Sequence, residues 1–242
     1  MQYHLDTIPV WEAMEADTDC PLCALYEKCE RSEVERSLGG SVMEPDERIR
    51  VNETGMCARH HQQLYAQQNR LGHALLADSH TKELLKKLNA MEPGKGKRGF
   101  LSRGEDVRPL AERLEKLASE CVICQNIDAH MKRYFYTFVH LWKTDTSFRQ
   151  RWEASRGVCI PHACALIRFA QDALSGPKRA AFCQSVLERL SLSLAQDEKD
   201  LEWFTLKFDY RNQDKPWGNS RNALERTVNR LRGRCLKDGR EA

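Results

Sequence analysis

The sequence predicts an all-α protein made of two related helical modules that are closed by a C-terminal pair of helices. Apolar residues recur at steps of three and four along much of the chain, as on one face of a helix. No useful length of the chain alternates apolar and polar residues as a β-strand would. A set of cysteine and histidine motifs occurs twice, in the same order, which predicts that the modules are duplicates.

Composition narrows the class of protein. The chain has 242 residues, enough to bury a core without disulfides, and 30% of them are charged while 8% are aromatic. The formal net charge is only +3, and proteins that grip nucleic acid through its phosphates usually carry a stronger basic excess. The acidic start, MQYHLDTIPVWEAMEADTD, resembles no secretory signal, and no run of residues suits a membrane span. We therefore expect a cytoplasmic protein without nucleic acid or membrane as its partner.

Apolar spacing and helix-terminal residues predict the helices in order. Pro161 is placed to open one helix, a long helix follows Pro177, and Ser220 is a good N-cap for the last. A further stripe runs from Val107 directly into Cys121. The apolar positions of these helices are Leu84, Leu85, Leu88 and Met91; Val107, Leu110, Leu114, Leu117 and Cys121; Leu166, Phe169 and Leu174; Phe182, Val186, Leu190, Leu194, Leu201, Phe204 and Phe208; and Leu224, Val228 and Leu231.

Two stretches lack this pattern and are predicted to be irregular. Residues 38–55 lead into a CxxH motif, and residues 93–105, PGKGKRGFLSRGE, combine glycine with basic side chains as an exposed linker would. The predicted organisation is a first module at residues 1–92, the linker at 93–105, a second module at 106–176 and the C-terminal helices at 177–242.

The repeated motifs are a CxxC pair followed by a GxCxxH segment. Cys20-Pro-Leu-Cys23 precedes Gly55-Met-Cys57-Ala-Arg-His60, and Cys57 lies 34 positions after Cys23. Cys121-Val-Ile-Cys124 precedes Gly157-Val-Cys159-Ile-Pro-His162, and Cys159 lies 35 positions after Cys124. Agreement in order, residue type and spacing indicates an internal duplication.

These residue types at this spacing predict two structural zinc ions. Zinc takes thiolate and imidazole ligands in a closed tetrahedron, and Cys₃His is one of its common sets. The CxxH pairs are expected to open helices, where positions i and i+3 share a face and the positive end of the dipole favours thiolate. An iron–sulfur cluster or redox dithiols would use the same thiols and stay open as alternatives. We expect each ion to be bound within one repeat, because duplication of a self-sufficient unit is the simpler origin and shorter loops cost less to close, although ligation across the repeats stays open.

The chain resembles a known family. The segments DTIPVWEAMEADTDCPLC, GGSVMEPDERIRVNETGMCARH, CVIC with SRGVCIPH, and KFDYRN are similar to those of a bacterial family without assigned function, which carries paired CPLC and GxCxxH motifs. The resemblance implies a cysteine-rich helical protein and supports metal binding, but it implies no reaction, substrate or partner. In this chain His61 directly follows His60, so either imidazole is a candidate ligand. The candidate metal ligands are Cys20, Cys23, Cys57, His60, Cys121, Cys124, Cys159 and His162.

The expected function is that of an interaction or regulatory module whose zinc is structural. Four protein ligands at each ion leave no open position for catalysis, and no GxSxG, P-loop, HExxH or Gly-rich dinucleotide motif is present, so an enzyme is not expected. The expected partner is another protein or a small ligand. The alternatives are a thiol-based redox or metal sensor and, third, a nucleic-acid-binding protein.

Overall fold

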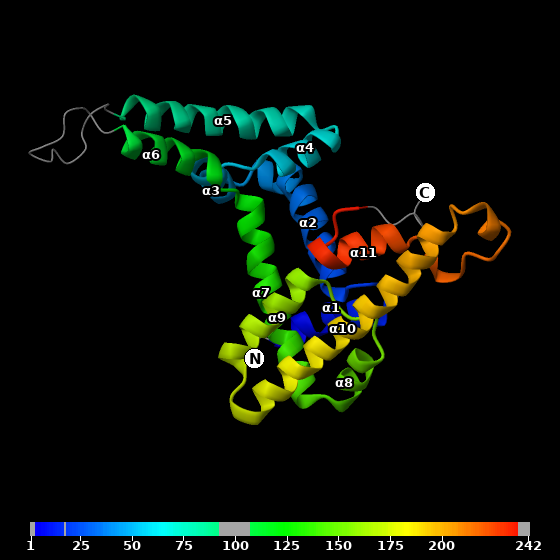
Figure 1. Ribbon diagram of the computed structural model, residues 1–242. Coiled ribbons are helices and arrows are strands. Elements are labelled where there is room, and N and C mark those ends of the chain that lie inside the picture. Colours follow the sequence, from blue (N-terminus) through cyan, green and yellow to red (C-terminus); the bar gives the residue numbers. More distant parts are fainter. Residues whose placement is uncertain (1–2, 17, 92–106, 237–242) are drawn as a thin grey trace, which may run out of the picture. The chain divides into compact units, whose positions relative to one another are not determined.

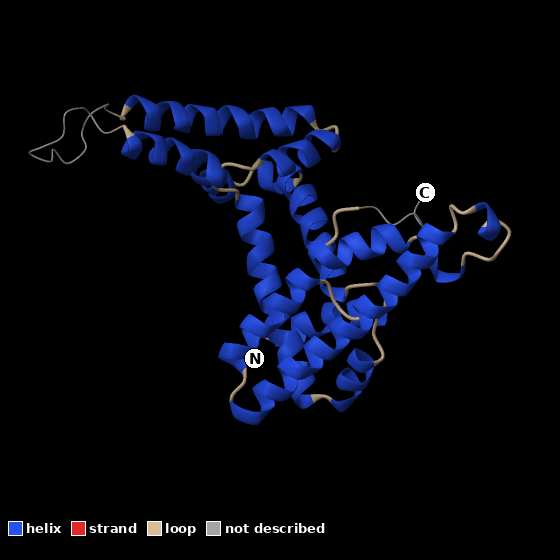
Figure 2. Ribbon diagram, viewed as in Figure 1, coloured by secondary structure: helices blue, strands red, loops and turns tan. Residues whose placement is uncertain are grey.

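The computed structural model describes residues 3–16, 18–91 and 107–236, and within these ranges every regular element is a helix (Figure 2). The all-α class is therefore confirmed. The linker predicted at residues 93–105 lies outside the described residues. None of the helices in the described ranges combines the length and the apolar character that crossing a membrane requires.

The chain divides into two compact units, one formed by residues 1–28 together with 130–242 and the other by residues 29–129. We call them the outer unit and the inner unit, because residues 29–129 lie between the two segments of the other unit in the sequence. The boundaries fall inside helix α2 (Pro21–Leu38) and inside helix α7 (Val122–Thr144). This division follows spatial contacts, and the repeat boundaries predicted from the motifs stay predictions.

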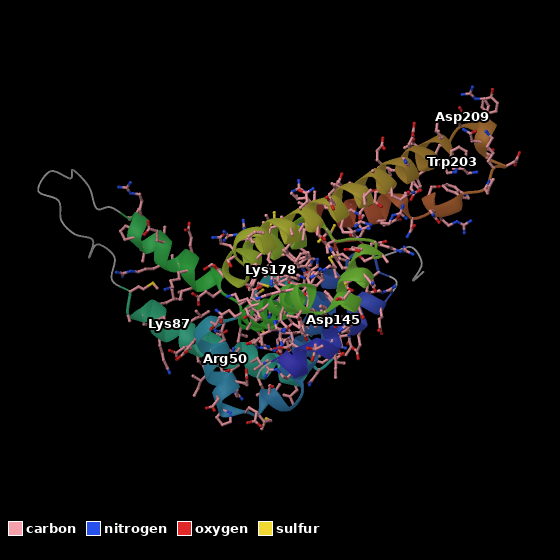
Figure 3. All side chains as sticks on the ribbon, turned by 90° about the horizontal axis from the view of Figure 1, so that it is seen from below. Arg50, Lys87, Asp145, Lys178, Trp203 and Asp209 are labelled. Atoms are coloured by element: carbon pink, nitrogen blue, oxygen red, sulfur yellow. The ribbon has the colours of Figure 1, made fainter. Side chains whose placement is uncertain are left out.

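The outer unit is built around the 31-residue helix α10 (Gly176–Leu206), which packs against α9 (Ile160–Ala173) and α11 (Ala223–Arg232) (Figure 1). Helix α1 (Tyr3–Glu15) packs on α8 (Thr146–Glu153). The short helices η2 (Tyr210–Asn212) and η3 (Gly218–Ser220) lie between α10 and α11. Trp203 marks the C-terminal end of α10, and Asp209 follows at the turn beyond it (Figure 3).

Aromatic side chains fill the core of the outer unit. Phe138 lies edge-to-face against Phe148 and Trp152, with ring centroids 5.0 and 5.3 Å apart, and all three side chains are at most 1% exposed. Phe182 of α10 meets Trp142 in the same edge-to-face manner at 5.0 Å. This geometry adds to the stabilisation that burial of the rings already provides.

The inner unit contains η1 (Gly40–Val42), α3 (Pro45–Thr54), α4 (Ala58–Ala66), α5 (Arg70–Asn89) and α6 (Arg108–Ser119), with parts of α2 and α7. Helix α3 packs against α5. The buried apolar side chains of this unit come mainly from α2, α3, α4, α5 and α7: Val34, Leu38, Val51, Leu64, Leu76, Val122, Ile123 and Ile127. Helix α6 has no buried residue.

The prediction that residues 38–55 are irregular is wrong, because α3 occupies Pro45–Thr54. The sequence carries the signals of a short helix there. Pro45 stands in the first turn, Asp46 and Glu47 complement the positive end of the helix dipole, and Gly55 ends the helix with a φ of 77°. Only Val51 among its residues is buried, so the segment shows little of the apolar periodicity that predicts a helix.

Two predicted boundaries also need correction. The stripe from Val107 to Cys121 does not form one helix into the CxxC motif, because α6 ends at Ser119 and Glu120 is extended, with φ −94° and ψ 153°. The last helix begins at Ala223 with Asn222 at the N-cap position, whereas Ser220 belongs to η3. The helices predicted from Pro161 and Pro177, and the C-terminal pair α10 and α11, are confirmed.

Candidate metal centres

All four motifs lie at the N-terminal ends of helices. Cys57 and Cys159 are the N-cap residues of α4 and α9, and their backbones are nearly identical, with φ and ψ of −77° and 164° in one and −74° and 158° in the other. Cys20 and Cys121 directly precede the first residues of α2 and α7. Thiolates at these positions face exposed N–H groups and the positive ends of helix dipoles. The prediction that the CxxH pairs open helices is confirmed.

The first centre consists of Cys20, Cys23, Cys159 and His162 and lies entirely in the outer unit. The Cys159 sulfur is 3.8 Å from that of Cys20 and 3.6 Å from that of Cys23. Nδ1 of His162 lies 3.4 Å from the sulfurs of both Cys20 and Cys23 and 3.1 Å from the sulfur of Cys159. The three cysteines are buried, and His162 is partly exposed.

The second centre consists of Cys57, His60, Cys121 and Cys124 and lies entirely in the inner unit. Nδ1 of His60 is 3.2 Å from the sulfurs of Cys57 and Cys121 and 3.4 Å from that of Cys124. The sulfurs of Cys57 and Cys124 are 3.9 Å apart. His60 and Cys121 are buried, whereas Cys57 and Cys124 are partly exposed.

These separations fit four ligands around one ion. A tetrahedron with zinc bond lengths places two sulfurs about 3.8 Å apart and a sulfur and a nitrogen about 3.5 Å apart. In each centre all four donor atoms lie within 4.8 Å of one another, and every cysteine is a free thiol. Both clusters are therefore able to hold a metal ion.

The pairing of motifs differs from the one expected. Each CxxC meets the CxxH of the other repeat. The two motifs of the first centre thus bring together ligands 136 to 142 positions apart, and those of the second bring together ligands 61 to 67 positions apart. The expectation of ligation within repeats rests on duplication of a self-sufficient unit and on loop closure, and the second argument is weak. Closing a loop of 136 residues instead of 34 costs only about 1.2 kcal/mol more, because the cost grows with the logarithm of length. A structural zinc site contributes the same binding free energy, about 10–16 kcal/mol, in either pairing, so the small difference in loop closure leaves the packing of the helices to decide the pairing.

Of the two adjacent histidines, His60 is the one that faces the sulfurs. His61 points elsewhere, and its Nδ1 lies 2.9 Å from Nε2 of His73, with the two rings stacked. His60 and Cys57 are three positions apart at the start of α4, which places them on the same face. The choice of His60 as the candidate ligand agrees with this geometry.

Glu30 of α2 supports His60 from behind. Its Oε1 is 3.3 Å from Nε2 of His60, and its Oε2 accepts from Nη2 of Arg59 at 2.8 Å. Burial alone would raise the pKa of Glu30, but its hydrogen bonds to His60 and Gln63 and the nearby Arg59 lower it, so the carboxylate stays ionised. A carboxylate that accepts from Nε2–H fixes the tautomer in which Nδ1 is available to a metal.

Electrostatics in the second centre also favours a cation. Burial would lower the pKa of His60, but the facing Cys121 and Glu30 raise it to about 10. Burial would raise the pKa of Cys121, yet hydrogen bonds with His60 and with backbone N–H groups lower it to about 6. Burial and the neighbouring Cys121 raise the pKa of Cys124 to about 12, because a second thiolate would be repelled. A divalent cation bound between the sulfurs offsets that repulsion and lets all three thiols ionise.

The glycine of each GxCxxH motif has a positive φ, a backbone conformation that side chains disfavour. Gly55 has φ 77° and ψ −165°, and Gly157 has φ 87°. A Cβ on Gly157 would lie 2.3 Å from Oγ of Ser193, and one on Gly55 would lie 2.7 Å from Nε2 of His80. The Gly55 carbonyl accepts from the N–H of Val122 at 3.0 Å, which joins the two motifs of the second centre.

In the first centre a buried arginine joins the two motifs instead. The residue that corresponds to Val122 is Pro21, which has no N–H to donate. Nη1 of Arg230 donates to the carbonyls of Asp19 and Val158, at 3.1 and 3.4 Å, and these residues directly precede Cys20 and Cys159. Sequence reasoning missed Glu30 and Arg230, because neither has a fixed spacing to the residue that it supports.

Comparisons with known proteins give a family but no activity. No curated protein and no solved structure matches the chain. A family model described as a family of unknown function, DUF6062, matches residues 1–238. Because this family model covers nearly the whole sequence, the chain belongs to this family of unknown function.

Proposed function

We propose that each centre binds one zinc ion and that the zinc-stabilised helical body acts as an interaction or regulatory module for another protein or a small ligand. The observation that carries this proposal is the arrangement of the donor atoms. Each compact unit brings together three thiols and one imidazole at the separations of a tetrahedral site.

A structural role for the metal is favoured over a catalytic one. Three cysteines and one histidine complete the coordination of zinc, so no position is left for a water to be activated. Three of the four residues in the first centre are buried, as in sites that hold helices together. The close grouping of the donors also favours one ion over a multinuclear iron–sulfur cluster, whose thiolates are spread around several metal atoms.

A redox or metal sensor is the second candidate, favoured by the exposure of the second centre. Cys57 and Cys124 are partly exposed, so an oxidant can reach their thiolates more easily than the buried sulfurs of the first centre. Low doses of peroxide would then release one zinc ion before the other. Zinc that stays bound in both centres through mild peroxide treatment would favour the structural module.

Paired cysteine substitutions test the metal assignment together with its crossed ligation. Elemental analysis under reducing, metal-replete conditions should find about two zinc ions in the unaltered protein. Cys20→Ser with Cys159→Ser should remove one ion, and Cys57→Ser with Cys121→Ser should remove the other. Cys20→Ser with Cys57→Ser should remove both, because these two residues belong to different centres.

Ligation within the repeats would give the reverse result. The Cys20 and Cys57 pair of substitutions would then leave one ion bound, and the Cys20 and Cys159 pair would leave none. One ion or fewer in the unaltered protein would contradict two zinc centres altogether. Cobalt substitution gives an independent readout, because the intensity of the cobalt–thiolate absorption bands reports how many sites are occupied.

The interaction role is tested by capture from the native host with a tagged chain. The variant with Cys20→Ser and Cys57→Ser is the control, since it should lose the metal from both units. A partner retained by the unaltered chain and lost by this variant supports a zinc-dependent surface. Equal retention by both proteins would show that zinc does not maintain the surface that binds.

A further inference from the structure

A cavity of about 630 Å³ in the outer unit is lined by an unusual number of arginines. Its volume falls within the range of small-molecule sites, which is about 300–1,000 Å³. Arg156, Arg189, Arg221, Arg226 and Arg230 line it, and we call it the arginine pocket. Every lining residue belongs to the outer unit. None of the lining residues is a ligand of the first centre.

The wall of the arginine pocket contains a buried network of ion pairs. Asp197 of α10, which is 2% exposed, accepts from Nε of Arg226 at 2.8 Å and from Nε of Arg230. Asp200 accepts from Nη2 of Arg226 at 2.5 Å. The two aspartates therefore balance the two arginines of α11, and these hydrogen bonds hold this wall in one arrangement.

Among the described residues, no carboxylate balances two of the remaining arginines, Arg189 and Arg221. Arg156 pairs with Asp19 at 3.3 Å, which accounts for the third aspartate of the lining. Within the described ranges Arg221 makes no ion pair or hydrogen bond, and Arg189 donates from Nη1 only to the Glu153 carbonyl. Nε of Arg189 is buried and meets no acceptor among the described residues. Among the described residues, the lining thus has five guanidinium groups against three carboxylates, an excess of two positive charges.

We propose that the arginine pocket binds a small organic phosphate through Arg189 and Arg221. Two unpaired guanidinium groups match the charge of a phosphate monoester, about −1.5 to −2 at neutral pH. Guanidinium presents paired N–H donors that suit phosphate oxygens. The volume exceeds what a bare phosphate fills, and the amide side chains of Gln196 and Asn219 can bind the rest of the molecule.

This ligand is the small-molecule partner of the module proposed above, so the inference rests on that function for its role in the cell. Its binding, however, is measured independently of the metal. Arg230 reaches from the pocket to the backbone beside Cys20 and Cys159, so both sites share a wall although they share no ligand.

The experiment is calorimetric titration of the zinc-replete, full-length protein. The probes are AMP, glucose 6-phosphate and glycerol 3-phosphate, with inorganic phosphate, adenosine, glucose and citrate for comparison. At least one phosphate monoester should bind, and its unphosphorylated counterpart should not. Arg221→Gln and Arg189→Gln should each weaken that binding by about tenfold or more, the loss expected for a charge-assisted hydrogen bond.

Arg232→Gln is the matched control, because Arg232 is an exposed arginine of α11 outside the pocket. It should change the affinity by less than about twofold at physiological salt. Arg221 is exposed, so its substitution leaves the fold intact even if that of Arg189 does not. Circular dichroism and zinc content of each variant separate lost binding from lost folding or lost metal.

Three results would overturn the assignment. If no monoester binds at millimolar concentration, an organic phosphate of this kind is excluded. Citrate binding as well as the monoesters would show that the pocket selects negative charge and not phosphate. If Arg232→Gln lowers the affinity for the monoester as much as Arg221→Gln does, binding depends on the overall charge of the protein and not on the pocket.

Discussion

At the scale of single residues, the two centres differ in how their histidines are held. Nε2 of His60 faces the buried carboxylate of Glu30, which Arg59 holds in turn. In the part of the chain that the structure describes, no hydrogen bond is present at Nε2 of His162, whose ring lies against Phe135 with centroids 5.9 Å apart. A hydrogen-bonded carboxylate makes an imidazole a stronger and better oriented ligand.

Glu30→Gln should therefore weaken metal binding at the second centre alone. The amide keeps the size of the side chain but loses the charge that the imidazole Nε2–H faces, and such changes typically lower metal affinity by about 10–100-fold. Competition with a chromogenic chelator should show one of the two zinc ions released at lower chelator concentration. Glu35→Gln is the control, because Glu35 is an exposed glutamate of the same helix. Unchanged release of both ions from Glu30→Gln would show that Glu30 has no part in holding the metal.

The residues that could be predicted are those with a fixed spacing. Both CxxC pairs and both CxxH pairs can be recognised, because the two ligands of each motif are always three positions apart. Glu30 could not be found, since it meets His60 only when α2 packs against α4. The same holds for which CxxC meets which CxxH, because the separations along the chain differ in cost by only about 1 kcal/mol.

At the scale of elements, α11 is held on α10 by charge as well as by apolar contact. Arg226 and Arg230 lie one turn apart on α11, and both donate to Asp197, which α10 buries between them. Burying these charges is costly, and the network is stable only while every member keeps its partner.

Asp197→Asn should destabilise the outer unit by about 3–5 kcal/mol, the usual cost of removing one member of a buried ion pair. The amide fills the same space, so the loss reflects charge and not a cavity. Urea denaturation of the zinc-replete protein measures it, and Glu198→Gln, an exposed neighbour on α10, should stay within about 0.5 kcal/mol of the unaltered protein. Equal stability of the two variants would mean that apolar packing alone holds α11.

Helices with a broad apolar stripe could be predicted from sequence, and those defined only by their ends could not. The long α10 and the helix after Pro161 were found because apolar spacing and proline agree. Helix α3 was missed, although Pro45, the acidic first turn and Gly55 mark its ends. The apolar spacing continues from α6 into α7 although Glu120 between them is extended. Apolar spacing alone therefore could not predict that the helix is interrupted there.

At the scale of the whole molecule, each compact unit contains one complete centre. Removal of the metal should therefore loosen both units. Strong chelators should lower the helical circular dichroism and the melting temperature together, with recovery when zinc is returned under reducing conditions, because the binding free energy of a structural site is folding free energy. A metal-free protein, verified by elemental analysis, that keeps its full helical signal and melts at an unchanged temperature would contradict a structural role.

The crossed pairing also nests one centre inside the other along the chain. Cys57, His60, Cys121 and Cys124 all lie between Cys23 and Cys159. As the chain leaves the ribosome, the inner ligand set is complete once Cys124 has emerged. Cys20 and Cys23 emerge first of all, yet they must wait for Cys159 and His162, which are 136 to 142 positions further on. Of the eight ligands, the first two to emerge thus belong to the centre that is completed last.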